Sequence, residues 1–136
     1  YMNLVEHLVP QGYAIYALDH IGHGRSEGTR AHVEQFSDYT GTLQIYEGMV
    51  REWQPDKPFF LFGHSMGGLI AQAYLLERQD AFRGAILSGA AANMAEAMPP
   101  LMLLAARVLS ALAPKAGGAW IVIKLAYCTS ARLLQA

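Results

Sequence analysis

The sequence is poor in cysteine and in charge. Its single cysteine among 136 residues, Cys128, excludes an internal disulfide and any metal site built from several cysteines, and we expect it to pack as a small apolar residue. Charged residues make up only 15% of the chain, and the formal net charge is −1 at pH 7. Lys and Arg form no cluster, so the sequence lacks an electrostatic footprint for DNA or RNA and predicts no nucleic-acid partner.

Long uninterrupted apolar runs are also missing. The runs 99–106 and 108–113 are separated by Arg107, and the run 119–123 is followed by Lys124. None reaches the roughly 18 to 20 residues that a membrane-spanning helix requires. The first ten residues have an amphipathic helical pattern and no visible signal peptide. We therefore expect a cytoplasmic protein, with at most peripheral contact with a membrane.

What the sequence does contain is an alternation of helical and strand-like segments, sufficient for one hydrophobic core. In chain order, the expected elements are a helix over 1–10, a strand over 13–18, a helix over 36–53, a strand over 59–62, a helix over 69–76 and a strand over 85–88. Apolar strands separated by helices predict an α/β fold with a buried parallel sheet and right-handed crossovers. Ligands bind beyond the carboxyl ends of such strands, and Ser65, Ser88 and the loop 19–28 are expected at that edge.

A Gly-x-Ser-x-Gly motif at residues 63–67 lies between a strand-like and a helix-like run, as in a nucleophile elbow. This sharp turn is strained and favours small flanking residues, which Gly63 and Gly67 supply. The turn exposes the hydroxyl of Ser65 and places the N–H of Met66 at a helix N-terminus, where it can donate to an oxyanion. Ser65 is therefore our candidate nucleophile. The alternative is a packing turn in which Ser65 only caps the following helix.

A serine nucleophile needs a histidine base and a carboxylate that orients the histidine. All five histidines precede or adjoin Ser65, and the only later aspartate, Asp80, lies at the wrong end of the helix that follows the motif. His64 belongs to the turn itself, so we do not expect its ring to reach the Ser65 hydroxyl and interpret it as a supporting residue. We expect the acid and the base outside these 136 residues.

The loop 19–28 contains His20 and His23 among three glycines, a composition that could indicate a metal pair or a phosphate-binding loop. The glycine spacing misses the dinucleotide-binding pattern by one position, and no helix opens directly behind it. Two histidines three residues apart in such a loop are more often hydrogen-bonded than metal-bound. We expect no metal and no cofactor.

The segment after residue 90 is rich in methionine and leucine and does not repeat the β-α pattern. Its apolar residues either line a pocket for an acyl chain or belong to the core, and the sequence leaves both interpretations open. The candidates for the pocket are Met94, Met98, Leu101 and Met102.

Three segments of the chain carry a family resemblance: DHIGHGRSEG at 19–28, GHSMGG at 63–68 and AILS at 85–88. With these segments in the right order, the chain closely resembles the monoacylglycerol lipase and lysophospholipase branch of the α/β-hydrolases, which also contains enzymes similar to serine aminopeptidases. The resemblance implies an elbow formed by Gly63, His64, Ser65, Met66, Gly67 and Gly68, with Ser65 as nucleophile and Met66 as oxyanion donor. It implies that residues 1–90 are the central part of the hydrolase core and that 91–136 begin a helical cap. About the last 20 residues no longer resemble the family.

The expected function is therefore hydrolysis of a small carboxylic ester, a monoacylglycerol or a lysophospholipid, through an acyl-Ser65 intermediate. Two alternatives remain open. One is a general carboxylesterase or serine peptidase of the same fold, and the other is a non-catalytic α/β fragment or pseudo-enzyme that binds an acyl chain or a partner protein.

Overall fold

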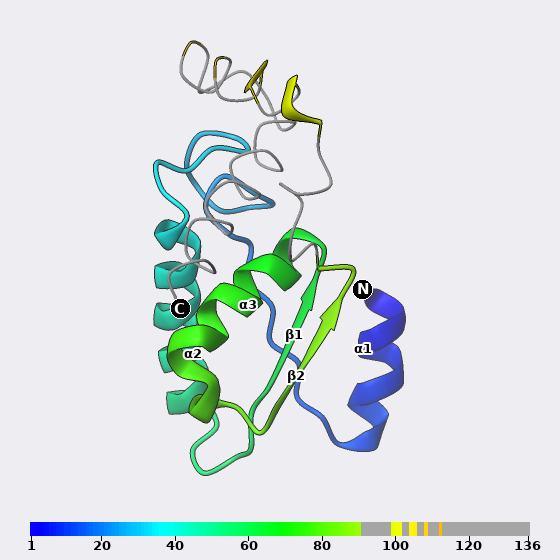
Figure 1. Cartoon of the computed structure of the whole chain (residues 1–136). Helices are drawn as coiled ribbons and strands as arrows, with labels where there is room; N and C mark the ends of the chain where they lie inside the picture. The colour runs from blue at the N-terminus through cyan, green and yellow to red at the C-terminus, as the bar shows by residue number, and fades with distance from the viewer. Residues whose placement is uncertain (91–98, 102–103, 106–107, 109–111, 113–136) are drawn as a thin grey trace.

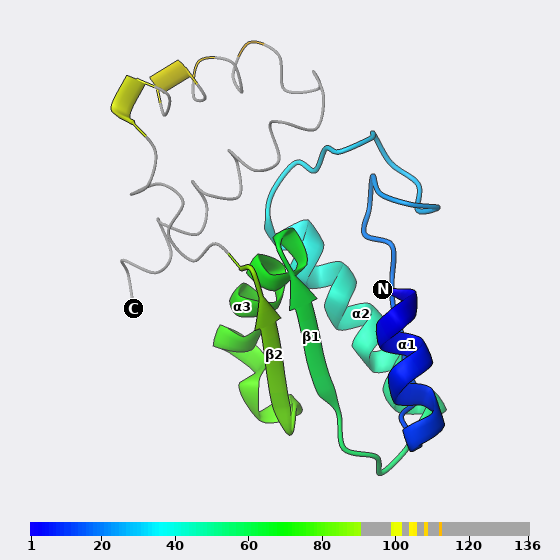
Figure 2. The ribbon, with the colours of Figure 1, turned by 90° about the vertical axis from the view of Figure 1, so that its right-hand side faces the viewer.

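The computed structural model describes residues 1–90, 99–101, 104–105, 108 and 112. Their elements are α1 (Met2–Leu8), the 3-10 turn η1 (Val9–Gln11), α2 (Ser37–Trp53), β1 (Phe60–His64), α3 (Met66–Arg78), the 3-10 turn η2 (Gln79–Ala81) and β2 (Gly84–Ser88). The two strands pair in parallel, with His64 opposite Ser88. α2 and α3 lie on one side of this sheet and α1 on the other (Figures 1 and 2). The predicted α/β architecture, a parallel sheet with helices on both faces, is confirmed.

The ends of the helices follow from local chemistry. η1 stops at Gly12, whose φ of 90° glycine adopts without a steric penalty. α2 ends at Trp53 because Gln54 precedes Pro55, and a residue before proline is driven away from the helical region. α3 begins immediately after Ser65, three residues earlier than its apolar periodicity predicts.

The core lies between α2 and the first turns of α3, next to the turn that leads out of β1. Tyr39 and Ile70 are each only 1% exposed, and Leu69 completes the cluster. The apolar side chains that pack against this cluster are Ala31, Val33, Phe36, Leu43 and Met66. The loop before α2 and the start of α3 are therefore held by the same core.

The strand predicted over residues 13–18 is wrong. In the described part of the chain this segment forms no regular element, and the sheet holds β1 and β2 alone. Side chains of α2 hold it instead: the Tyr46 hydroxyl donates to the Ala17 carbonyl at 3.0 Å, and Gln54 Nε2 donates to the Tyr16 hydroxyl at 2.7 Å. An apolar run predicts extension and burial, but a strand also needs a neighbour with which to exchange hydrogen bonds.

The strands are also less buried than their composition predicts. Phe60 is 57% exposed and Ile86 64%, and Phe62 is exposed as well. Side chains alternate along a strand, and the buried Gly63 packs against the first turn of α3, so these three residues lie on the face opposite α3. No helix in the described residues is long and apolar enough to cross a membrane.

Candidate active site

The turn between β1 and α3 holds Ser65 in a strained backbone conformation, with φ 53° and ψ −118°. For a residue other than glycine such a conformation costs about 1–3 kcal/mol and persists only where the surroundings enforce it. Here the Ser65 N–H donates to the Ser88 carbonyl at 2.8 Å, and the Leu69 N–H donates to the Ser65 carbonyl at 3.1 Å. Ser65 is exposed, and its side chain makes no capping hydrogen bond to α3. The capping alternative therefore has no support in the geometry.

The glycines around Ser65 differ in how tightly they are packed. A Cβ on Gly63 would lie 2.5 Å from the Gly67 carbonyl oxygen, and a Cβ on Gly68 would lie 2.7 Å from the Ala90 Cβ. Apart from its chain neighbours and the backbone of its own helix, a Cβ on Gly67 would meet no atom of the described residues within 4 Å. The need for a small residue is thus visible at Gly63 and at Gly68. At Gly67 no such need is visible within the described residues.

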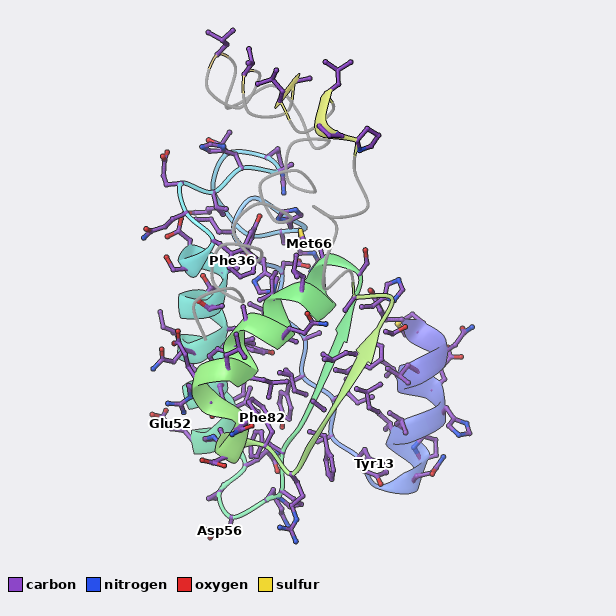
Figure 3. The ribbon with its side chains drawn as sticks, in the orientation of Figure 1. Tyr13, Phe36, Glu52, Asp56, Met66 and Phe82 are labelled. Atoms are coloured by element: carbon purple, nitrogen blue, oxygen red, sulfur yellow. The ribbon has the colours of Figure 1, made fainter. Side chains whose placement is uncertain are left out.

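Met66 is the first residue of α3, a position whose N–H has no acceptor within the helix. Its side chain is half-buried and packs against the core cluster that contains Tyr39 and Ile70. Phe36, from the loop before α2, packs against the same cluster, and Figure 3 shows it near Met66 at this end of the molecule. The side chain of Met66 is therefore anchored in the core while its N–H remains at the start of the helix.

His64 is the last residue of β1, and its Nδ1 lies 3.2 Å from the hydroxyl oxygen of Ser88 on the neighbouring strand. The ring of Tyr1 approaches His64 edge-on, with the ring centroids 6.3 Å apart. These contacts engage the ring with β2 and with the start of α1. The supporting role of His64 stays a prediction.

The loop 19–28 lies beyond the carboxyl end of β1, as expected for this fold (Figure 1). Its hydrogen bonds centre on Asp19, whose carboxylate accepts the Arg25 N–H at 2.9 Å and whose carbonyl accepts the Ser26 hydroxyl. Gly24, with φ 51°, lies so close that a Cβ there would meet the Asp19 carboxyl at 2.1 Å. This loop is a compact turn closed by its own side chains.

The two histidines of that loop face Tyr39. The ring centroids of His20 and Tyr39 are 5.3 Å apart in an edge-to-face arrangement, and those of His23 and Tyr39 are 6.1 Å apart. Burial lowers the pKa of His20, and the nearby His23 lowers it further. His23 Nδ1 lies 3.0 Å from the Ile21 carbonyl. Among the described residues no three His, Cys, Asp or Glu side chains gather in a way that could hold a metal ion.

The predicted acyl-pocket residues are mostly not placed. Met94, Met98 and Met102 lie outside the described residues. Leu101 is helical and 78% exposed, so in this structure it lines no pocket formed by the described part of the chain.

Glu47, which the sequence did not single out, is buried with its side chain 4% exposed. Its carboxylate accepts hydrogen bonds from the Tyr74 hydroxyl, from Arg51 Nε at 2.5 Å and from Arg78 Nη2 at 3.3 Å. Burial alone would raise the pKa of Glu47, but these hydrogen bonds outweigh it and hold the pKa below its usual value. One signal in the sequence could have revealed this buried carboxylate: Glu47 interrupts the apolar stripe of its helix between Leu43 and Val50.

This cluster of Glu47 and its partners ties α2 to α3 far from Ser65. Arg51 also donates to the Ala81 carbonyl, and Tyr74 packs edge-on against Phe82 with centroids 6.1 Å apart. Figure 3 shows Phe82 below Met66, beyond the far end of α3. Burial and the hydrogen bond to Glu47 raise the pKa of Tyr74 far above its usual value, so its hydroxyl keeps its proton. The cluster is a structural link between the two helices.

Comparison with known proteins gives consistent matches. The profile of the family described as "Serine aminopeptidase, S33" matches residues 1–129. Monoacylglycerol lipase of Mycolicibacterium smegmatis is 35% identical over 114 residues, which are 84% of this chain and 41% of that protein. Human monoglyceride lipase is 37% identical over 116 residues, 84% of this chain and 38% of that protein. Phospholipase YtpA of Bacillus subtilis is 30% identical over 115 residues, 84% of this chain and 44% of that protein.

A solved structure matches as well. The crystal structure of Paleococcus ferrophilus monoacylglycerol lipase superposes with a TM-score of 0.67 at 32% sequence identity, covering 84% of this chain and 42% of that chain. The chain thus spans about two fifths of the length of these relatives.

Proposed function

Because this chain belongs to the serine aminopeptidase S33 family of α/β-hydrolases, we propose that the whole protein is a serine hydrolase of carboxylic esters with Ser65 as its nucleophile. The observation that carries the proposal is the turn itself. An exposed serine with φ 53° stands between the last residue of a parallel strand and the first residue of a helix. This is the backbone geometry that presents a nucleophilic hydroxyl in the α/β-hydrolases.

The proposed reaction is acyl transfer through an acyl-serine. The Ser65 oxygen attacks the ester carbonyl while its proton passes to a base, and the oxyanion that forms accepts the N–H of Met66. The alcohol then leaves with a proton, and water releases the acid from Ser65. No histidine follows Ser65 in the sequence, so we assign the base and its carboxylate to residues outside these 136. His64 is not the proposed base: its Nδ1 lies 3.2 Å from the Ser88 hydroxyl oxygen, and in the described residues no hydrogen bond joins its ring to the Ser65 hydroxyl.

The proposed substrates are monoacylglycerols or lysophospholipids. Relatives that are named monoacylglycerol lipase and phospholipase support a lipid ester over a water-soluble one. We further propose that the protein is cytoplasmic and reaches such a substrate by peripheral contact with a membrane, which cell fractionation would test. Peptide hydrolysis is a second candidate because the family description names an aminopeptidase.

The test is a comparison of substrates with the whole protein. We expect turnover of a monoacylglycerol and of a lysophospholipid, slower turnover of an aminoacyl p-nitroanilide, and loss of several orders of magnitude in every active case on Ser65→Ala. Ser37→Ala, at the first position of α2, is the matched control and should keep full activity. Ester turnover that survives Ser65→Ala would contradict the proposal, and a preference for the anilide would favour the peptidase.

A further inference from the structure

Ser88, the last residue of β2, contacts both Ser65 and the residue before it. Its carbonyl accepts the N–H of Ser65 at 2.8 Å, and its hydroxyl oxygen lies 3.2 Å from Nδ1 of His64. The register of the sheet places Ser88 directly opposite His64. One residue of the neighbouring strand therefore holds the backbone of the serine and the side chain next to it.

We propose that Ser88 is a positioning residue for the nucleophile, acting through the contact between its hydroxyl and the His64 ring. The proposal rests on the proposed function, because it concerns how Ser65 is placed for attack. The strained φ of Ser65 cannot be kept by Ser65 alone, so atoms on either side must fix it. On the α3 side, Gly63 is fixed by its close approach to Gly67. On the opposite face, the ring of His64 at the end of β1 contacts the hydroxyl of Ser88 on β2.

The surroundings of His64 show why its ring needs an anchor. His64 is exposed, and it lies on the sheet face where Phe62 is also exposed. Tyr1 approaches this ring edge-on, and Gly89 carries no side chain against it, although a Cβ there would lie at an ordinary contact distance of 3.5 Å from Cε1. The ring contact with Tyr1 guides the ring, but the hydroxyl of Ser88 supplies its hydrogen-bond partner. Without that partner the ring can turn into solvent, and the end of β1 loses its side-chain link to β2.

The side chain of Ser88 can be tested separately from its backbone. Ser88→Ala keeps the carbonyl that accepts the Ser65 N–H, so it removes only the contact with His64. In the whole protein we expect kcat to fall about tenfold with KM changed less than twofold, because displacing a reacting group by a fraction of an ångström acts on the chemical step. Ser88→Thr keeps a hydroxyl and should restore most of kcat. Ser37→Ala is the control for loss of a serine elsewhere.

A double-mutant cycle shows whether the effect passes through His64. In a His64→Ala background, Ser88→Ala should cost nothing further, whereas His64→Asn, which keeps a polar atom near the position of Nδ1, should retain part of the effect. The NMR signals of the His64 ring, assigned by their loss in His64→Asn, should shift in Ser88→Ala and stay unchanged in Ser37→Ala.

The outcomes separate this proposal from the proposed function. A kcat unchanged in Ser88→Ala, or a loss that persists fully in the His64→Ala background, would overturn the positioning role. The second result would mean that the hydroxyl acts by another route. Absence of Ser65-dependent turnover in the wild-type protein would overturn the proposed function. The ring signals do not depend on turnover, so an unshifted His64 signal in Ser88→Ala would still overturn the contact itself.

Discussion

The glycines of the Gly-x-Ser-x-Gly motif should respond in opposite ways to substitution by alanine. At Gly63 a Cβ would lie 2.5 Å from the Gly67 carbonyl oxygen and 2.8 Å from the Gly68 Cα, both backbone atoms. Ordinary contact begins at 3.4 Å, so the first turn of α3 would have to retreat from β1 by about 0.9 Å. Forcing atoms into a packed site costs typically about 1–3 kcal/mol, and backbone neighbours place Gly63→Ala at the upper end of that range.

Gly67 provides the matched control within the same motif. The residue lies in the first turn of α3, and outside the backbone of that helix a Cβ there meets no atom of the described residues within 4 Å. Alanine has a higher helix propensity than glycine by roughly 0.8–1 kcal/mol in a helix interior and less at an end. Gly67→Ala should therefore leave the free energy of unfolding unchanged or raise it by a few tenths of a kcal/mol.

The assay is urea unfolding of the whole protein with each substitution, together with the rate at which a fluorophosphonate labels Ser65. Gly63→Ala should lower the unfolding midpoint and slow labelling, because the retreat of α3 distorts the turn that positions the Ser65 hydroxyl and the Met66 N–H. Gly67→Ala should leave the midpoint at or above the wild-type value. Equal losses of stability in the two variants would refute the reasoning from Cβ distances.

Three further predictions concern the core and the turn. Tyr74→Phe removes a hydrogen bond to the buried carboxylate of Glu47 and should cost about 1.5–3 kcal/mol at neutral pH by urea unfolding. The pKa of Glu47 is lowered in the fold, so this cost should shrink as the pH falls below about 4.5, the usual pKa of a glutamate, and a constant cost would contradict it. Burial also lowers the pKa of His20. Below pH 6.5 the unfolded chain therefore binds a proton that the half-buried ring of the folded chain does not, so the free energy of unfolding should fall. His20→Phe, which keeps the edge contact with Tyr39, should show a flatter pH dependence than wild type between pH 6.5 and 5. Finally, Ser65→Gly should be more stable than Ser65→Ala by about 1 kcal/mol or more in thermal unfolding, since glycine adopts φ 53° without strain, and an equal stability would mean that the turn is not strained.

Much of the fold follows from periodicity. The helix predicted over 36–53 is observed at Ser37–Trp53, and the two paired strands lie within two residues of their predicted limits. These elements succeed because apolar residues at a fixed spacing report which side of an element is buried. The segment 13–18 fails because a strand is defined by its hydrogen-bonded neighbour, and no local pattern contains that neighbour.

The site could be predicted in part. The motif predicts a strand, a sharp turn at Ser65 and a helix starting at its carboxyl side, and the structure has this order. The contact between His64 and Ser88 could not be predicted, because it depends on the register between strands 24 residues apart in the chain. Glu47 was missed for a similar reason. A charged residue on an apolar stripe conflicts with binary patterning, and two of its three partners, Tyr74 and Arg78, come from another helix.

The most direct test of the central claim is to map the residue that a fluorophosphonate labels in the whole protein. After proteolysis, mass spectrometry should find the adduct on the peptide that contains Ser65, and labelling should disappear in Ser65→Ala while it persists in Ser37→Ala. Competition with a monoacylglycerol should slow the labelling. An adduct on another serine, or labelling that persists in Ser65→Ala, would contradict the assignment of Ser65 as the nucleophile.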